Sequence, residues 1–213
     1  MRAGADPAAA RAGLVLLHGR GGSAGDLVPL LRAAGLTDVA ALAPQAPGHS
    51  WWPTSFLAPQ AQIEAHVTRG LAAVAAAVGD LVQAGLPRGR IWLCGFSQGA
   101  WLALESFARQ GDGLAGVLAF SGGLVGTGDA PGPAQPALLG YGPKRFDYPG
   151  RRDGAQVWIG VHQADPHIPL ARVQDSATVL RGLGAQVTVQ VHPGAGHGVM
   201  PSDVGAVHDL LAA

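Results

Sequence analysis

Short apolar segments recur along the chain, and most of them are continuous rather than alternating with polar residues. Continuous apolar runs of this length are typical of strands that are buried on both faces of a parallel sheet. The predicted strands are residues 14–17, 39–42, 91–94, 116–120, 156–161 and 186–191.

Segments with helical periodicity lie between and after these strands, at residues 24–33, 59–84, 98–110, 169–181 and 201–211. Ser23 is placed to cap the first helix, and Pro59, Pro169 and Pro201 stand where a first helical turn tolerates a missing N–H. The alternation of strand and helix predicts an α/β fold, with a doubly wound, mostly parallel sheet and helices on both faces. Its 213 residues form most simply one domain, 1–213.

Two stretches interrupt this alternation, residues 43–58 with their prolines and tryptophans and residues 122–154 with their many glycines and prolines. Both are predicted to be long loops. Because long ordered loops in compact domains often form binding surfaces or lids, both are candidates for contact with a ligand, and 122–154 is a candidate lid-like insertion.

Composition narrows the classes of protein. Acidic and basic residues balance at 14 each, so no electrostatic footprint for nucleic acid is present. The single cysteine, Cys94, allows no intramolecular disulfide and is predicted to be a buried, inert thiol. No run approaches the roughly 18 apolar residues of a membrane span, and the first 13 residues lack the apolar core of a secretory signal. We therefore expect a cytoplasmic protein without a membrane span.

The sequence Gly95-Phe96-Ser97-Gln98-Gly99 carries the strongest chemical signal. A Gly-x-Ser-x-Gly turn between a strand and a helix lifts a serine hydroxyl above the sheet as a nucleophile. In a chain with 33 glycines the pattern can arise by chance, but here an apolar strand precedes it and a helical pattern follows it. Ser97 is the candidate nucleophile.

A serine nucleophile needs an imidazole to take its proton and a carboxylate to orient that imidazole. In this kind of fold they follow later strands, in the order Ser, Asp, His. Asp165 follows the strand at 156–161, and His197 follows the strand at 186–191. Asp153 precedes its strand and Asp175 falls within a helix, so Asp165 is the better orienting acid.

His192 competes with His197 for the role of the base, because it stands at the very end of the last strand. We favour His197, whose glycine-rich loop lets the backbone turn the ring toward Ser97. His162-x-x-Asp165-x-His167 also admits a metal site, but its spacing lacks the definition of zinc motifs, so no metal is expected.

Two backbone N–H groups should stabilise the oxyanion of the transition state. One is the amide of Gln98, at the start of the helix after Ser97. The other is expected from the glycine-rich loop after the first strand, where Arg20 is the best candidate. That loop lacks the Gly-Lys-Ser/Thr ending and the Gly-x-Gly-x-x-Gly spacing of nucleotide sites.

Taken together, these motifs resemble the alpha/beta-hydrolase superfamily and, within it, the phospholipase/carboxylesterase group that includes acyl-protein thioesterases. The resemblance runs through most of the chain and rests on Leu17-His18-Gly19, Ala43-Pro44-Gln45-Ala46-Pro47, Gly95 to Ala100, Phe120-Ser121-Gly122-Gly123, Asp165-Pro166-His167-Ile168-Pro169 and Gly196-His197. It implies a trimmed version of that fold and a cofactor-free serine carboxylesterase, with Ser97, Asp165 and His197 catalytic and the amides of Arg20 and Gln98 as oxyanion hole. The implied substrates are small or medium-chain esters or thioesters, hydrolysed through an acyl-enzyme.

The sequence departs from acyl-protein thioesterases at Arg20, where those proteins usually carry leucine. Its guanidinium either meets a polar group of the substrate at the pocket mouth or faces solvent while the backbone alone acts. Trp51, Trp52, Phe56 and Ile168 are candidates for the substrate pocket, since ligand sites are mostly apolar, although the aromatic residues fit a core equally well.

Two other functions stay open at this stage. One is a hydrolase of lactones or aromatic esters in a degradation pathway, and the other is a non-catalytic ligand-binding protein on the same fold. The sequence also leaves a homodimer open.

Overall fold

Seven strands form one sheet in the order β1-β3-β2-β4-β5-β8-β9, in a computed structural model that describes residues 1–212. Every neighbouring pair is parallel except β1 with β3. The strands are β1 (Arg2–Gly4), β2 (Ala12–Leu17), β3 (Val39–Leu42), β4 (Ile91–Phe96), β5 (Gly116–Phe120), β8 (Gln156–Ala164) and β9 (Gln186–Ala195). The six predicted strands are therefore all present.

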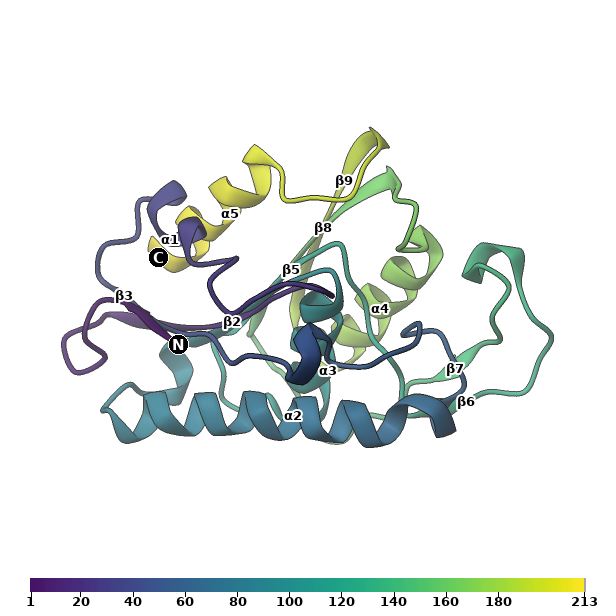
Figure 1. Ribbon diagram of the computed structural model, residues 1–213, viewed down its shortest axis with the longest axis horizontal. Coiled ribbons are helices and arrows are strands. Elements are labelled where there is room, and N and C mark those ends of the chain that lie inside the picture. The colour runs from purple at the N-terminus through teal and green to yellow at the C-terminus, as the bar shows by residue number, and fades with distance from the viewer. Residues whose placement is uncertain (213) are drawn as a thin grey trace.

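Helices cover both faces of this sheet (Figure 1). On one face lie α2 (Gln60–Gln83), α3 (Gln98–Gln110) and α4 (Leu170–Gly182), whose apolar side chains share one core cluster. On the other face α1 (Pro29–Ala33) and α5 (Pro201–Ala212) belong to a second cluster. The predicted doubly wound α/β fold is confirmed.

Helix α2 is by length and composition alone long and apolar enough to cross a membrane, although no run of the sequence was expected to be. Its buried residues recur every three or four positions, as Ile63, Val67, Leu71, Val74 and Val78 show. This spacing places one stripe of the helix in the core beside the sheet. Within the structure, α2 therefore packs one face against the core and leaves the opposite face outside it.

The N-terminal part of the chain differs from the prediction in two ways. Helix α1 begins at Pro29 rather than at residue 24, because a proline fits the first turn of a helix but not its interior. Ser23 consequently does not cap it, and its hydroxyl donates to Asp26 Oδ1 at 2.6 Å instead. Strand β1 was not predicted, because it has only three residues and no apolar pattern; it pairs antiparallel with the edge of β3.

The two long loops contain little regular structure. Residues 43–58 hold one 3-10 turn, η1 (Pro47–His49). Outside these loops, another 3-10 turn, η2 (Arg88–Arg90), precedes β4. Residues 122–154 hold the two-stranded pair β6 (Gly128–Asp129) and β7 (Lys144–Arg145) and the turn η3 (Pro136–Leu138), beside the N-terminal end of α2 (Figure 1).

The strand order reverses direction between β2 and β4. From β2 the chain moves outward to β3, whereas from β4 it moves the opposite way, to β5, β8 and β9. In doubly wound folds, ligands bind beyond the carboxyl ends of the strands at such a reversal. The glycine-rich loop after β2 and the Ser97 turn after β4 both lie at this crevice, because Leu17 pairs with Gly95 at the ends of the two strands.

Candidate active site

Ser97 occupies a sharp turn between β4 and α3, with φ of 52° and ψ of −119°. A non-glycine residue held in so sparsely populated a conformation costs about 1–3 kcal/mol, and such strain is found at functional sites. The flanking glycines make the turn possible. A Cβ on Gly95 would lie 2.3 Å from the carbonyl oxygen of Gly99, and one on Gly99 would lie 1.9 Å from that of Leu17.

His197 and Asp165 meet Ser97 in a continuous chain of hydrogen bonds. His197 Nε2 lies 2.9 Å from Ser97 Oγ, and His197 Nδ1 lies 2.8 Å from Asp165 Oδ2. Because a carboxylate only accepts, Nδ1 carries the proton and Nε2 accepts from the serine hydroxyl. The Asp165 side chain is fully buried, and its Oδ1 also accepts the amides of His167 and Ile168. These bonds fix the carboxylate behind the imidazole.

His192, the alternative base, points elsewhere. Its Nε2 donates to Asp203 Oδ2 at 3.0 Å, and Asp203 also accepts from Trp158 Nε1 and from the amide of Met200, each at 2.9 Å. His192 and Asp203 are almost completely buried. The structure therefore brings His197, and not His192, to Ser97.

His162, which follows the predicted end of its strand at residue 161, lies within β8, because this strand runs three residues further than expected. Its buried ring packs 5.4 Å from that of His192 and directly beneath Gly196. In the part of the chain that the structure describes, no group of three His, Cys, Asp or Glu side chains could hold a metal ion. The metal interpretation of the His162 to His167 segment has no structural support.

The amides of Arg20 and Gln98, the predicted oxyanion hole, make no hydrogen bond within residues 1–212. Both residues line the same cavity as Ser97. The Gln98 side chain has a further role that the sequence did not reveal. Its Oε1 accepts the amide of Trp51 at 2.8 Å, and its Nε2 donates to the carbonyl of Trp52 at 2.8 Å. Gln98 thus joins the helix after the nucleophile to the 43–58 loop.

His18 organises the loop that carries Arg20, another role absent from the sequence analysis although the Leu17-His18-Gly19 motif marked the place. The ring is buried, its Nδ1 donates to the carbonyl of Gly19 at 2.7 Å, and its Nε2 accepts the amide of Ala46 at 3.1 Å. The His18 ring therefore joins two loops at the carboxyl ends of the strands that are far apart in sequence.

The Arg20 guanidinium is engaged by the protein. It donates to the carbonyl of Pro53 at 2.7 Å and to the carbonyl of Thr54. We expected the side chain either to meet a polar group of the substrate or to face solvent. It lines the cavity and also joins the glycine-rich loop to the 43–58 loop, so neither expectation describes it fully.

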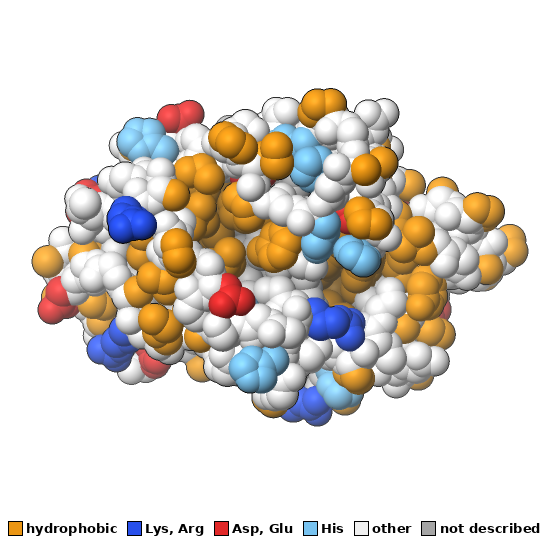
Figure 2. Space-filling view, turned by 45° about the horizontal axis from the view of Figure 1, so that its top comes forward, with side chains coloured by type: hydrophobic (Ala, Val, Ile, Leu, Met, Phe, Trp, Pro, Cys, Tyr) orange, Lys and Arg blue, Asp and Glu red, His pale blue; other side chains and the backbone are white. Residues whose placement is uncertain are grey.

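A cavity of about 560 Å³ opens at Ser97 and His197. Its volume falls in the range of small-molecule sites. Three of the predicted pocket residues, Trp52, Phe56 and Ile168, line it. On the face shown in Figure 2, histidine and apolar side chains surround a hollow.

Trp51, the fourth predicted pocket residue, does not line this cavity. Its indole N–H donates to the carbonyl of His18 at 2.9 Å, and its ring packs against the His18 ring. Trp51 therefore supports the glycine-rich loop from behind, because its backbone amide is held by Gln98 and its side chain is turned into the core.

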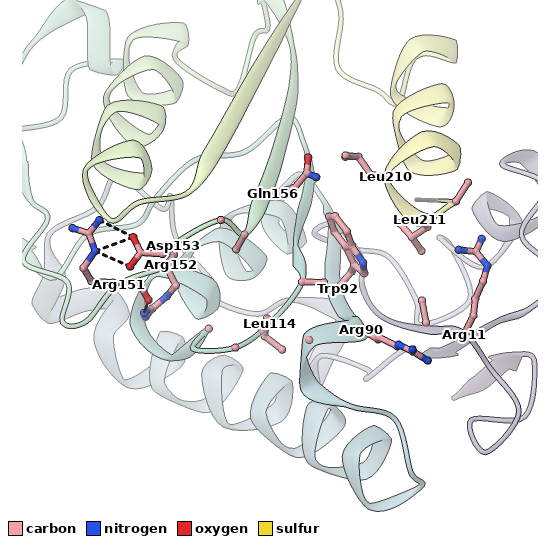
Figure 3. Close-up of a pocket in the computed structure, with 18 residues that line it drawn as sticks. Arg11, Arg90, Trp92, Leu114, Arg151, Arg152, Asp153, Gln156, Leu210 and Leu211 are labelled. Carbon is pink, nitrogen blue, oxygen red and sulfur yellow. Dashed lines mark hydrogen bonds and ion pairs between the residues drawn. The ribbon is translucent and has the colours of Figure 1, made fainter.

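A larger hollow, of about 840 Å³, lies at the amino ends of the strands, between the end of α5 and the residues before β8 (Figure 3). Four arginines line it, but three are paired, since Arg151 bonds Asp153, Arg152 bonds Asp112 and Arg11 bonds Asp38. None of the described residues that line it is a serine, a histidine or a cysteine. The smaller cavity at the carboxyl ends is therefore the candidate active site.

A strained serine between β4 and α3, a histidine at bonding distance and a buried aspartate behind it, on a doubly wound sheet, define an α/β hydrolase. The sequence profile of the phospholipase/carboxylesterase family matches residues 4–137. The chain belongs to this family.

Individual relatives agree with that membership. A phospholipase/carboxylesterase from Dyadobacter fermentans is 34% identical in sequence, and the structural match covers 100% of this chain and 95% of that one with a TM-score of 0.87. A Bacillus cereus carboxylesterase, 17% identical, shares the fold with a TM-score of 0.77 over 100% of this chain and 92% of that one.

A curated relative, acyl-protein thioesterase 1 of Gibberella zeae (strain PH-1), is 28% identical over 130 residues, or 61% of this chain. The match spans only 50% of that relative's own length.

Proposed function

We propose that this protein is a serine carboxylesterase that hydrolyses small or medium-chain carboxylic esters or thioesters through an acyl-enzyme. The observation that carries the proposal is the unbroken chain of hydrogen bonds from Ser97 through His197 to Asp165, which opens on a cavity beside two unbonded amides. Membership of the phospholipase/carboxylesterase family supports the same reaction class.

In the first half of the reaction, Ser97 Oγ attacks the ester carbonyl carbon while His197 Nε2 takes the hydroxyl proton. The negative charge moves to the carbonyl oxygen, which accepts from the amides of Arg20 and Gln98. When the tetrahedral intermediate collapses, the bond to the leaving oxygen or sulfur breaks. His197 returns the proton to that atom, so an alcohol or a thiol departs and Ser97 keeps the acyl group.

In the second half, water attacks the acyl carbon and His197 accepts one of its protons. Collapse of this intermediate breaks the bond to Ser97 Oγ, to which His197 returns the proton, and the carboxylic acid leaves. Asp165 stays ionised and stabilises the imidazolium that forms twice in each cycle. The chemistry in this scheme is carried by side chains, amides and water alone.

The state of Cys94 is consistent with this assignment of the nucleophile. The side chain is fully buried in β4, and burial raises the pKa of its thiol. A protonated, inaccessible thiol does not compete with Ser97. A single reduced cysteine also suits the cytoplasmic location that we propose.

A fluorophosphonate probe and p-nitrophenyl acetate together test the proposal. The wild-type protein should be labelled at Ser97 and should release p-nitrophenol, whereas Ser97→Ala should fold normally, resist labelling and lose turnover. Full hydrolysis by Ser97→Ala would contradict the serine mechanism. Labelling and turnover that are absent from the wild type would favour the non-catalytic binding protein instead.

A further inference from the structure

One turn of the 122–154 segment reaches back to the candidate active site. The turn comprises residues 135–141 and includes η3, and its Leu139 and Tyr141 line the cavity of Ser97. The amide of Gln135 donates to the carbonyl of Tyr141, and the amide of Gly140 donates to that of Gln135, at 2.9 and 3.0 Å. These bonds close the 135–141 turn into a defined unit.

Leu139 combines two unfavourable features. Its φ of 55° and ψ of 32° lie in the left-handed region, which costs a residue other than glycine about 1–2 kcal/mol. Its side chain is also 54% exposed, so it adds little to the core. A leucine that suits neither its backbone nor the core, and that lies on the wall of the cavity, points to contact with a ligand.

The segment that carries this turn is fixed to the body of the protein on both sides of the turn. Glu105 of α3 is fully buried, and its Oε2 accepts the amides of Val125 and Gly126 at 2.9 and 3.2 Å. The same oxygen accepts the hydroxyl of Tyr148 at 2.7 Å. Residues on both sides of the turn are therefore attached to the helix that follows Ser97.

Lys144, the only lysine of the chain, provides a second attachment just after the turn. Its buried ammonium donates to the carbonyl of Ala58 at 2.5 Å and to Asp129 at 2.6 Å. Because Ala58 ends the 43–58 loop, the two loops that line the cavity are joined directly. The 135–141 turn is therefore held in place beside the cavity.

The part of the substrate that meets this wall follows from the reaction. The leaving group must lie at His197 Nε2, where it receives its proton. The His167 ring packs 5.0 Å from the His197 ring and lines the same cavity. The acyl chain then takes the rest of the cavity. Among the other residues that line the cavity, Phe56 stacks on Trp101 at 3.5 Å between ring centroids, and Leu139 and Tyr141 add further apolar surface.

We propose that Leu139 and Tyr141 form an apolar wall of the acyl-binding part of the cavity and give the enzyme a preference for acyl chains longer than acetyl. This inference rests on the esterase function proposed above.

The test compares kcat/KM on p-nitrophenyl acetate, butyrate, hexanoate and octanoate for the wild type, Leu139→Ala, Leu139→Asn and Tyr141→Ala. In each variant we expect kcat/KM on hexanoate and octanoate to fall about fivefold to tenfold relative to its value on acetate, as lost apolar contact requires. Asparagine tolerates the left-handed backbone, so Leu139→Asn should keep the wild-type Tm.

Val82→Ala provides the matched control, since Val82 is an exposed apolar side chain of α2 that does not line the cavity. It should leave the chain-length profile unchanged. A second series, phenyl, 4-nitrophenyl and 1-naphthyl acetate, varies only the leaving group and should not distinguish the Leu139 variants from the wild type.

An unchanged chain-length profile in the Leu139 and Tyr141 variants would contradict the proposal that these residues contact the acyl chain. So would an effect confined to the leaving-group series, or a gain on octanoate, which would show that Leu139 blocks longer chains. Failure of the esterase function itself is recognised separately, because Ser97→Ala would then hydrolyse acetate as well as the wild type does.

Discussion

Two histidines near the end of β9, His197 and His192, each bond an aspartate at a similar distance, but the surroundings of the two pairs differ. The ring of His197 is 2.8 Å from Asp165, and that of His192 is 3.0 Å from Asp203. The first pair presents the free nitrogen of its histidine to Ser97 at 2.9 Å. The second is enclosed, with the indole of Trp158 bonded to its carboxylate.

The contrast lies in what the second nitrogen of each histidine ring can reach. The side chain of His197 is 20% exposed and lines the cavity. The side chain of His192 is 5% exposed and does not line it. Catalysis requires a free nitrogen that faces both a nucleophile and a substrate. The buried pair instead holds the start of α5 against the sheet, through Asp203.

The largest expected effect separates the two histidines. His197→Ala should lower kcat/KM on p-nitrophenyl acetate by about 10⁴-fold to 10⁶-fold, since the proton acceptor is lost. His192→Ala should stay within about tenfold of the wild type at a temperature where it is folded. Steady-state kinetics on both proteins measure the difference, and a more damaging His192→Ala would reverse the assignment of the base.

The two aspartates should differ almost as strongly in activity. Asp165→Asn should keep the fold but lower kcat by about 10⁴-fold, because an amide favours the wrong imidazole tautomer. Asp203→Asn should leave kcat close to the wild-type value.

In stability the order of the aspartates should reverse. In Asp203→Asn the amide N–H₂ must face one of the buried donors of Trp158, Met200 and His192. The unsatisfied groups should cost about 2 kcal/mol, or about 4–8 °C in Tm for a chain of this length. Calorimetry of both variants checks this, and an Asp203→Asn protein as stable as the wild type would contradict the structural role.

The smallest expected effect concerns Gly196, which precedes His197 and packs against the ring of His162. A Cβ on Gly196 would lie 2.8 Å from the buried ring of His162, which packs against His192. Gly196→Ala should therefore displace His197 and lower kcat by about 10- to 100-fold, as a misplacement of about 1 Å can. The second change His162→Ala removes the obstructing ring and should restore part of kcat. Without that rescue, the steric explanation fails.

Much of the fold followed from local patterns. Each of the six predicted strands is present, because a continuous apolar run is recognisable without knowledge of its neighbours. The exceptions have local causes as well. Pro29 delays the start of α1, and β1 is too short to carry a pattern. The edge of β3 recruits β1 through backbone pairing that its side chains do not signal.

The residues of the candidate site could be predicted only in part from local sequence patterns. The turn around Ser97 could be identified because its glycines and its position between strand and helix are local requirements. Trp51 and Trp52 are adjacent in sequence, yet only Trp52 faces the cavity. Their difference depends on the Gln98 side chain, which holds the backbone of both from another part of the chain.

The order of chemical groups along the chain was sufficient to propose Ser97 and Asp165, to narrow the candidate base to His197 or His192, and to predict the class of fold around them. Which histidine meets the serine, what the Arg20 side chain holds, and how the 135–141 turn reaches the cavity depended on three-dimensional packing. The physical reason is distance along the chain. Periodicity reports which face of an element is buried, but contacts between segments 30 to 100 residues apart, such as Ser97 with His197, arise only when the sheet brings their ends together.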